Sequence, residues 1–545
     1  MPVPDSIATR VGAAARAHTS RRGFLGALAS SLAWPGAALA QSAQSLRIAT
    51  ATEPSSFDPH FTYFGPNRQA HMPVFEPLVM YGADLSLHPA LATQWRATGP
   101  TGWEILLRPS VRFHDGTPFE AEDIVFSLAR AQRIPNSPST LGVYTQAIKS
   151  IVAADPLRLV VETHGTAPLL MRDLANIPII SRRVSAQATT ASFDAGQGVV
   201  GTGPYRFVEW KKGRSIDYAA FDEHWNGRPH WRTVTVSHMP DAAARVAALL
   251  SGAVDFIDQL PAAAQASLRQ RSEVNVMTVP SNFLIFLHMD QFRKVSPHIT
   301  AKDGSAIPNP LLDVRVRKAI SLAVDRDELV SRDLGGAAEA AFQLLPSSFP
   351  GTVPGRVGQA RDVAQARGLL REAGYPDGFR MVIHGTKGRY ANDTGVVQRV
   401  AEQLRSIGID ARAESLPSTE FFARASSGLN GEPAFSMILV GWASVEPSGA
   451  LKGLLATYDP RAGMGSSNRG RYGNREVDAL LASALRTADD TERAKLLARA
   501  TRIAVMDDQG IVPLYFPVNA WAARKGLRFD PRVDASTFPM DLIPG

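Results

Sequence analysis

The feature that most restricts the fold of this chain is a repeated alternation of helix-like segments and short strand-like segments. Residues 241–251 have the apolar spacing of a helix that ends near Gly252, and Val254–Ile257 then returns as a strand. A helix followed by a short buried strand predicts an α/β fold. The later segments of this kind are helices over Val314–Arg332, Val363–Ala373, Thr394–Ser406, Val477–Leu485 and Thr491–Met506, and strands over Arg380–His384, Phe435–Val440 and Ile511–Phe516.

The first part of the chain contains more strands and turns. Ser45–Thr50 and Trp103–Arg108 alternate between apolar and polar residues as strands do. Residues 120–129 predict an amphipathic helix with acids in its first turn, where they offset the helix dipole. His114–Thr117 predicts a structural turn, although a histidine beside an acid could be mistaken for catalytic machinery. Asp290–Pro310, rich in proline, serine and charge, predicts a long surface loop and is a candidate boundary between two lobes.

The N-terminal 40 residues predict an export signal. Arg21 and Arg22 precede the apolar run Leu25–Ala40, which closes on a small-x-small pattern. The arginine pair indicates the twin-arginine route, with cleavage after Ala40 and release into the periplasm. The apolar run is too short for a membrane span, which needs about 20 residues, so no membrane anchor is expected.

Missing residue types and motifs exclude several kinds of site. The chain has no cysteine, which excludes disulfides, thiolate metal sites, a cysteine nucleophile and a lipid-modified cysteine. It has no Gly-x-Ser-x-Gly elbow, no Gly-x-x-x-x-Gly-Lys phosphate loop and no His-Glu-x-x-His zinc motif. No basic cluster is interleaved with aromatic residues, so no nucleic-acid partner is expected. The 12 histidines lack metal-ligand spacing, and neither a metal nor a cofactor is expected, although a bound metal chelate stays an open alternative.

A set of short motifs runs in a recognisable order through almost the whole chain. The most specific is Leu107–Phe119, followed closely by Glu122–Leu128. In this order and at these separations, the chain resembles the extracellular solute-binding proteins of the peptide, dipeptide and nickel class (family 5) that feed ABC importers. The other matching pieces are Ala51–Pro59, Val74–Leu78, Pro89–Trp95, Gly201–Tyr205, Asp313–Ala319 and Leu369–Tyr375.

The resemblance implies a two-lobed periplasmic binding protein fold of α/β class, with the ligand enclosed between the lobes. It also implies an extra α/β subdomain inserted into lobe one. Two rigid lobes on a hinge suit the capture of a solute, because closure changes the surface that a membrane partner contacts. After the signal peptide at residues 1–40, the implied parts are lobe one at 41–72, 200–285 and 511–545, the inserted subdomain at 73–199, and lobe two at 286–510.

Candidate ligand-binding residues in lobe two follow from the resemblance. In peptide-binding relatives, an aspartate three positions after a Gly-Trp pair holds the ligand's free amine. Here Trp442 is present but Val445 stands at the acid position, and Glu446, one residue later, is the possible substitute. This departure argues against an ordinary peptide ligand. Trp442, Ser444 and Glu446 are candidate site residues, with core packing as the alternative for Trp442.

Two further loops supply candidates. In dipeptide-binding relatives, an arginine and a tyrosine of the loop that here holds Arg389 and Tyr390 face the cleft. The planar fork of an arginine suits a bidentate carboxylate contact. Tyr63, Phe64 and Asn67 lie where the family places cleft-lining residues. Each of these has a plainer alternative as a solvated or packed loop residue.

The function implied by the resemblance is binding without catalysis. We expect the protein to bind a peptide-like or modified amino-acid solute in the periplasm, with or without a carboxylate, and to deliver it to an inner-membrane permease and its ATPase. 

The expected assembly state is a monomer. Two alternatives stay open: a periplasmic hydrolase such as an esterase or peptidase, which would need a nucleophile beside a base, and a sensor partner or chaperone built on the same lobes.

Overall fold

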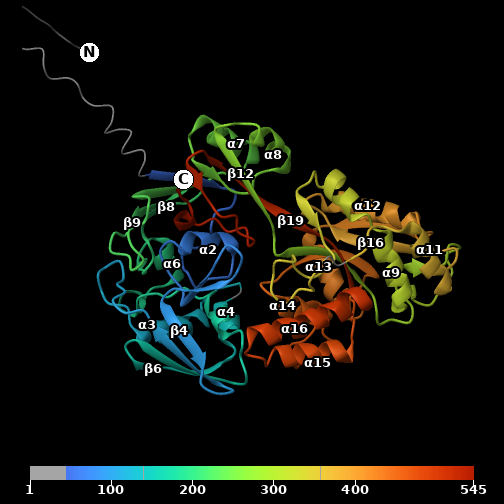
Figure 1. Cartoon of the computed structure of the whole chain (residues 1–545), viewed down its shortest axis with the longest axis horizontal. Helices are drawn as coiled ribbons and strands as arrows, with labels where there is room; N and C mark the ends of the chain where they lie inside the picture. The colour runs from blue at the N-terminus through green and yellow to red at the C-terminus, as the bar shows by residue number, and fades with distance from the viewer. Residues whose placement is uncertain (1–44, 139, 356–357) are drawn as a thin grey trace, which may run out of the picture. The chain divides into compact units, whose positions relative to one another are not determined.

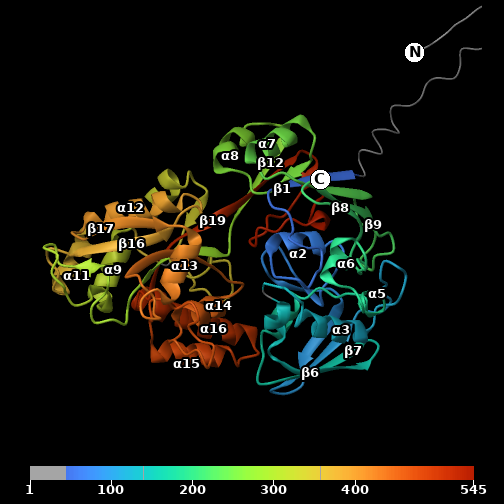
Figure 2. The same ribbon diagram turned by 180° about the vertical axis from the view of Figure 1, so that it is seen from behind.

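The computed structural model describes residues 45–138, 140–355 and 358–545, so the predicted signal peptide and its cleavage site lie outside the described residues. Within these ranges the helices and strands form a mixed α/β fold with two lobes (Figures 1 and 2). No helix in the described part of the chain is long and apolar enough to cross a membrane.

Lobe one is built on strands that pair around β1. β1 pairs in parallel with β10 and β11, and β10, β9 and β8 continue the sheet as antiparallel neighbours. β1 covers the residues predicted as the first strand. The strands and helices of lobe one are β1 (Ser45–Thr50), α2 (Gly65–His71), β8 (Tyr205–Lys211), β9 (Ser215–Ala220), β10 (Thr233–His238), α7 (Ala242–Ser251), β11 (Phe256–Ile257), α8 (Ala262–Arg269) and β12 (Val274–Pro280).

The predicted helix and strand at residues 241–257 are confirmed as α7 and β11. The Asp241 side chain accepts the Ala244 N–H at 2.7 Å and so caps the start of α7. Gly252 ends the helix with a φ of 76°, which suits glycine because it has no Cβ.

The inserted subdomain contains a separate four-stranded antiparallel sheet in the order β4-β5-β7-β6. The helix predicted from residue 120 is confirmed as α3, where Asp123 and Glu120 form a capping box. The elements of the subdomain are β2 (Val79–Tyr81), β3 (Leu87–Pro89), β4 (Ala92–Ala97), β5 (Gly102–Leu107), α3 (Ala121–Ala131), η1 (Leu141–Thr145), β6 (Ile148–Asp155), β7 (Arg158–Thr163), α4 (Leu170–Leu174), α5 (Arg182–Ser185) and α6 (Thr190–Asp194).

The segment His114–Thr117 is a structural turn, as predicted. His114 is buried and its Nε2 contacts the Gly203 carbonyl oxygen at 2.8 Å, while burial lowers the pKa of His114 to about 4. Asp115 accepts the Thr117 N–H at 3.0 Å and the Thr117 hydroxyl at 2.7 Å, which holds the turn. Gly201 lies so close to the Val74 carbonyl that a Cβ would collide with it, which explains a glycine at this position.

Lobe two is built on strands β13 to β18. β16 pairs in parallel with both β17 and β18, and β18 pairs antiparallel with β13. The strands and helices of lobe two are β13 (Phe283–Met289), β14 (Ile299–Thr300), η2 (Pro310–Leu312), α9 (Val314–Ala323), α10 (Arg326–Glu328), η3 (Leu329–Asp333), β15 (Ala338–Ala340), α11 (Val363–Glu372), β16 (Arg380–Thr386), α12 (Asp393–Arg405), β17 (Asp410–Leu416), α13 (Ser418–Ser427), β18 (Met437–Ala443), α14 (Pro447–Ala450), η4 (Leu451–Leu455), α15 (Arg475–Ala484), α16 (Asp490–Thr501) and η5 (Arg502–Asp507).

Strand β19 (Ile511–Arg524) links the sheets of the two lobes. Its first half pairs with β13 and β15, and its second half pairs with β12 and β11. Both views show β19 running between the two groups of elements (Figures 1 and 2). The chain also crosses between the lobes at Ser281 and Asn282, between β12 and β13. The C-terminal elements after β19 are β20 (Leu527–Arg528), η6 (Pro539–Asp541) and β21 (Ile543–Pro544).

The prediction of one helix over residues 314–332 is wrong. α9 ends at Ala323, because Val324 is extended and Asp325 caps a new helical turn by accepting the Glu328 N–H at 2.9 Å. The break lets the buried Arg326 donate to the carbonyl oxygens of Ala341 and Pro513 at 3.0 and 2.8 Å. The apolar spacing of the sequence does not reveal this buried arginine.

Residues 290–310 form a largely irregular segment with an exposed stretch at 302–306, as predicted, but the crossing between the lobes lies earlier, at Ser281 and Asn282, and parts of the segment are buried. Asp290, Ser296 and Asn309 are buried, and Ser296 donates to Asp290 at 2.8 Å. The Asp290 N–H donates to the Ser436 carbonyl at 2.8 Å, and β14 pairs with β16. Internal polar contacts therefore hold this segment against the sheet of lobe two.

Candidate functional site

The candidate site in lobe two lies where parallel strands end. β16 and β18 run in the same direction, so the loops after them leave the same edge of the sheet. The carboxyl ends of parallel strands are a common place for ligands in α/β folds. The loop after β16 carries Arg389 and Tyr390, and the end of β18 carries Trp442.

The loop between β16 and α12 is held by Asp393. The buried carboxylate of Asp393 accepts the Thr386 hydroxyl at 2.8 Å and the N–H groups of Gly388 and Arg389 at 3.0 and 2.9 Å. Burial alone would raise the pKa of Asp393, but these hydrogen bonds keep it below its ordinary value. The loop is therefore fixed while the Arg389 side chain stays exposed.

Arg389 and Tyr390 contact each other and the end of β18. The Arg389 Nε donates to the Tyr390 hydroxyl at 3.3 Å, and the Gly441 N–H donates to the same hydroxyl at 3.1 Å. The Tyr390 ring lies 5.9 Å from the Phe283 ring, centre to centre. The structure thus brings the predicted Arg389 and Tyr390 next to the residue that precedes Trp442.

Trp442 is half-buried and packs on η4. A Cβ on Gly453 would lie 2.7 Å from the Trp442 ring, so glycine is what permits this close packing. The Trp442 indole N–H donates to the Ser444 hydroxyl at 3.1 Å. Ser444 is buried, and its backbone pairs with Asn282 at the crossing between the lobes, with the Ser444 N–H donating at 3.2 Å.

Glu446 is buried among charged partners. Its carboxylate accepts the Ser448 hydroxyl at 2.5 Å and lies 3.6 Å from the buried Arg493 guanidinium. It also lies 3.8 Å from Arg172, which belongs to α4 of the inserted subdomain. In this conformation the Glu446 carboxylate interacts with other groups of the protein.

A cavity of about 560 Å³ lies beside Glu446, between the inserted subdomain and lobe two. Val445 and Glu446 line it from lobe two, and Trp95, Met171 and Arg172 line it from the subdomain. Asp173, the neighbour of Arg172, has a pKa raised to about 7 by burial, an effect that Lys452 of lobe two partly offsets. The sequence did not point to Arg172, Asp173 or Lys452, because they belong to separate segments that only the fold brings together.

Of the candidate residues of lobe one, Tyr63 and Phe64 lie just before α2 and Asn67 lies in its first turn. Tyr63 and Phe64 are exposed by 52% and 40%, and the Tyr63 ring lies 5.5 Å from the Tyr144 ring. Asn67 is buried instead, and its side-chain oxygen accepts the Ser55 N–H at 2.7 Å. The side chains of Tyr63 and Phe64 are therefore accessible to a ligand, whereas Asn67 fixes the loop.

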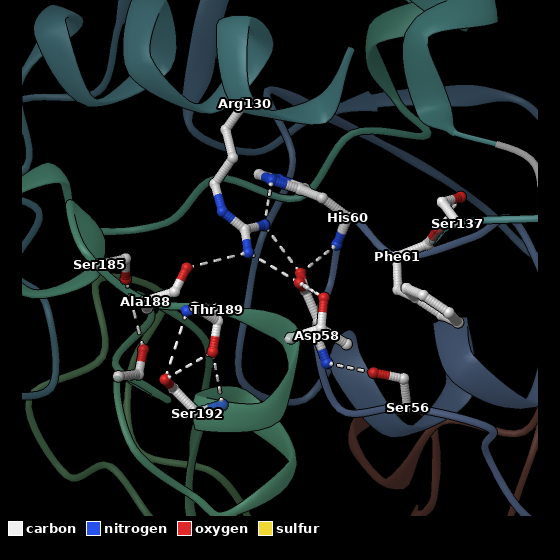
Figure 3. A network of polar contacts seen from close by, with 12 residues as sticks. Ser56, Asp58, His60, Phe61, Arg130, Ser137, Ser185, Ala188, Thr189 and Ser192 are labelled. Atoms are coloured by element: carbon white, nitrogen blue, oxygen red, sulfur yellow. Dashed lines mark hydrogen bonds and ion pairs between the residues drawn. The ribbon is translucent and has the colours of Figure 1, made fainter. Parts of the chain in front are cut away.

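A buried ion pair anchors this loop (Figure 3). Arg130 of α3 makes a two-pronged contact with Asp58, with distances of 2.8 and 2.7 Å. His60 accepts from Arg130 at its Nδ1, 3.2 Å away, and the Ser137 hydroxyl donates to the Phe61 carbonyl at 2.5 Å. These contacts tie the start of the loop to the inserted subdomain.

The described residues contain no group of three or more histidine, aspartate or glutamate side chains that could hold a metal ion. One serine lies beside a histidine, where Ser86 Oγ is 2.9 Å from His88 Nε2. The Ser86 hydroxyl donates to Asp84 at 2.5 Å, so its proton is directed at the acid rather than at the histidine. This exposed hairpin lacks the order of contacts that a nucleophile, base and orienting acid require.

Comparisons with known proteins agree with this fold. A family model described as bacterial extracellular solute-binding proteins, family 5 Middle, matches residues 86–460. The chain is 27% identical over 455 residues to the glutathione-binding protein GsiB of Pectobacterium atrosepticum, covering 82% of this chain and 84% of that protein. It is 26% identical over 485 residues to heme-binding protein A of Haemophilus influenzae, covering 83% of each.

Solved structures share the same architecture. HbpA2 from Haemophilus parasuis matches with a TM-score of 0.80 at 22% identity, covering 92% of this chain and 100% of that chain. The unliganded open form of MppA, a periplasmic murein tripeptide binding protein, matches with a TM-score of 0.78 at 21% identity, covering 92% and 97%. These likenesses support the two-lobed fold, and none of the comparisons supports the hydrolase alternative.

Proposed function

Because the chain belongs to the bacterial extracellular solute-binding proteins of family 5, we propose that it captures a small carboxylate-bearing solute between its lobes. It then delivers the solute, unaltered, to the permease of an ABC importer. Two lobes joined at β19 and at Ser281–Asn282 suit this role, since a few residues at a hinge can absorb the change between open and closed states.

The observation that carries the carboxylate proposal is the state of Arg389. Its guanidinium is exposed, at the carboxyl end of a parallel strand, and no carboxylate among the described residues pairs with it. Its backbone is fixed by Asp393, so the site is organised before a ligand arrives. A fixed guanidinium can bind a carboxylate through two parallel hydrogen bonds.

The proposed cargo is peptide-like or a modified amino acid. Two curated relatives are named for binding glutathione and heme, and both of these molecules carry carboxylates. Val445 replaces the acid that holds the amine in peptide-binding relatives, which favours a ligand held mainly through its acidic groups.

We propose that direct contacts to the ligand come from five residues: Trp442, Arg389, Tyr390, Tyr63 and Phe64. The aromatic residues would cover apolar parts of the solute while Arg389 fixes its orientation. Ser444, Glu446 and Asn67 complete the proposed site as buried supports, because each is hydrogen-bonded within the protein.

The proposed place of action is the periplasm, reached by the twin-arginine route with cleavage after Ala40. The motif at Arg21 and Arg22 supports the export route, and a relative of the same fold is named as periplasmic. We propose that the protein acts as a monomer without a catalytic step. Gene neighbours encoding a permease and an ATPase would support transport over a sensor or chaperone role.

Mass spectrometry of small molecules that co-purify with the natively folded protein tests this function. We expect an intact molecule with at least one carboxylate, recovered unchanged after incubation with the protein. Recovery of a hydrolysed product, formed at a rate that depends on the protein, would contradict the proposal.

Calorimetric titration of the co-purified molecule tests Arg389. The Arg389→Ala variant should bind it about 1.5–3 kcal/mol more weakly, the range for a hydrogen bond to a charged group. Arg405→Ala, at an exposed arginine at the end of α12, is the matched control and should bind normally. Unchanged affinity in Arg389→Ala would remove this residue from the site.

A further inference from the structure

A second arginine lies beside the proposed site. The Arg389 guanidinium carbon is 5.0 Å from the centre of the Phe422 ring, and that of Arg469 is 5.5 Å from the same centre. Arg469 comes from the loop between η4 and α15, far in sequence from the loop of Arg389. Two guanidinium groups thus gather around one aromatic ring of α13.

Apart from the Phe422 ring, the Arg469 side chain has no hydrogen-bond or ion-pair partner among the described residues. Its Nε is buried without a hydrogen-bond partner, and no carboxylate lies within ion-pair distance. Burial lowers the pKa of the Arg469 guanidinium, which the neighbouring Tyr390 hydroxyl partly offsets. Its positive charge is therefore poorly compensated by the protein itself.

Other buried and half-buried arginines of lobe two differ in this respect. Arg471, two residues along the same loop, pairs with Glu432 at 2.8 Å, and Arg326 donates to backbone carbonyls. Among the described residues of lobe two, each of the others in these burial classes also contacts a carboxylate or carbonyl oxygens: Arg293, Arg317, Arg399, Arg424 and Arg493.

An unpaired, partly buried charge is costly, and a second positive charge nearby adds repulsion. A ligand with an acidic group at each guanidinium would remove both costs and supply charge-assisted hydrogen bonds. Resting on the proposed function, we propose that Arg389 and Arg469 together bind a ligand that carries two acidic groups, with Phe422 as the surface between them.

This inference narrows the cargo to solutes that carry two acidic groups. A solute with a single carboxylate would leave one of the two guanidinium groups without a partner. Glutathione and heme, for which two curated relatives are named, each carry two carboxylates. The site is thus proposed to select for two acidic groups, and Arg469 is its second specificity-determining residue.

Equilibrium dialysis with radiolabelled sulfate at low ionic strength tests the pair without knowledge of the cargo. Sulfate serves as a small dianionic probe of the positive charge that the two guanidinium groups create. We expect one saturable site in the unaltered protein and at least a tenfold loss of sulfate affinity in Arg389→Gln and in Arg469→Gln. Arg471→Gln, from the same loop but with a carboxylate partner, is the matched control and should bind sulfate normally.

Three results would overturn the inference: no saturable sulfate binding by the unaltered protein, unchanged affinity in Arg469→Gln, or an equal loss in Arg471→Gln. Circular dichroism and thermal unfolding establish that each variant is folded. If Arg469→Gln does not fold, Arg469→Lys keeps the charge and should still lose affinity several-fold, because lysine lacks the planar fork. Unchanged sulfate affinity in Arg469→Lys would then reject the inference.

The same variants separate this inference from the proposed function. If the co-purified solute loses affinity in Arg389→Ala but binds Arg469→Gln normally, the carrier function stands and the paired site fails. If the protein instead consumes the solute, the carrier function fails whatever sulfate does.

Discussion

Two arginines, one in each half of the molecule, are placed in opposite ways. Arg130 of the inserted subdomain is mostly buried and makes a two-pronged contact with the fully buried Asp58. Arg469 of lobe two is also partly buried, but its Nε has no partner among the described residues. The first arginine is satisfied by the protein, and the second leaves its charge available.

The difference in pairing distinguishes an arginine that stabilises the fold from one that can bind a ligand. A buried charge with a full set of partners holds the fold together, because losing either partner leaves the other uncompensated. A buried charge without partners destabilises the free protein but is available to bind a ligand. The loop of Tyr63 and Phe64 is therefore expected to be stabilised by contacts within the protein. The charges of Arg389 and Arg469 are expected to be neutralised by the solute.

The largest expected effect is the loss of the anchor under lobe one. Asp58→Ala should lower the free energy of unfolding by about 3–5 kcal/mol, because Arg130 would stay buried without its partner. Urea denaturation measures this. The double variant Asp58→Leu with Arg130→Met should lose less than Asp58→Ala alone, and an equal or larger loss would show that the ion pair is not the cause.

Acid should weaken the same anchor. His60 Nε2 lies 2.7 Å from the Pro178 carbonyl and its Nδ1 accepts from Arg130, so the neutral ring satisfies both nitrogens. Burial, and then the charge of Arg130, lowers the pKa of His60 to about 4. The unfolded chain takes up this proton first, so the stabilisation is complete above the ordinary pKa of 6.5 and is lost as pH falls toward 4.

At about 1.4 kcal/mol for each pKa unit, His60 should account for about 3 kcal/mol of the stability lost between pH 7.5 and 4. Unfolding free energies measured at both pH values should differ less in His60→Gln than in the unaltered protein. His230→Gln, at an exposed histidine, serves as control. The same pH dependence in His60→Gln and in the unaltered protein would contradict this role.

A smaller effect is expected from crowding Trp442. Gly453→Ala would place a methyl group 2.7 Å from the indole ring, and the displacement should cost about 1–3 kcal/mol of stability. Gly65→Ala, in α2 of lobe one, would place its methyl group in open space and should change stability little. Thermal unfolding compares the two variants, and equal shifts would reject the packing argument.

The smallest effect is expected from single hydroxyl groups. Tyr390→Phe removes the acceptor of the Gly441 N–H and should cost about 0.5–1.5 kcal/mol of stability. Tyr63→Phe, at a side chain 52% exposed, should have no measurable effect on stability. Urea denaturation measures the free energy of unfolding of both variants, and an equal loss in the two would contradict a structural role for the Tyr390 hydroxyl.

Local patterns predicted much of the fold correctly. The apolar spacing and capping residues around α3 and α7 marked both helices, because these signals depend only on neighbours in sequence. The break after Ala323 escaped prediction, because it depends on carbonyl groups at Ala341 and Pro513 that receive the Arg326 guanidinium. Contacts between residues that are distant in sequence cannot be predicted from a local pattern.

The candidate site divides in the same way. Arg389 and Tyr390 could be chosen from one loop, and the structure places them beside the end of β18. The proximity of Arg469 to Phe422 and Arg389 could not be read from the sequence, since these residues come from three separate segments. The burial of Glu446 beside Arg493 was hidden for the same reason.

By itself, the sequence determined the family, the α/β class and the loops that carry the first candidate residues, because motifs and periodicity are properties of contiguous segments. Only the tertiary structure decided which charges are neutralised within the protein and which are left for a ligand. Pairing depends on distances between side chains that folding brings together, and those distances separate Arg130, which has its acid, from Arg469, which does not.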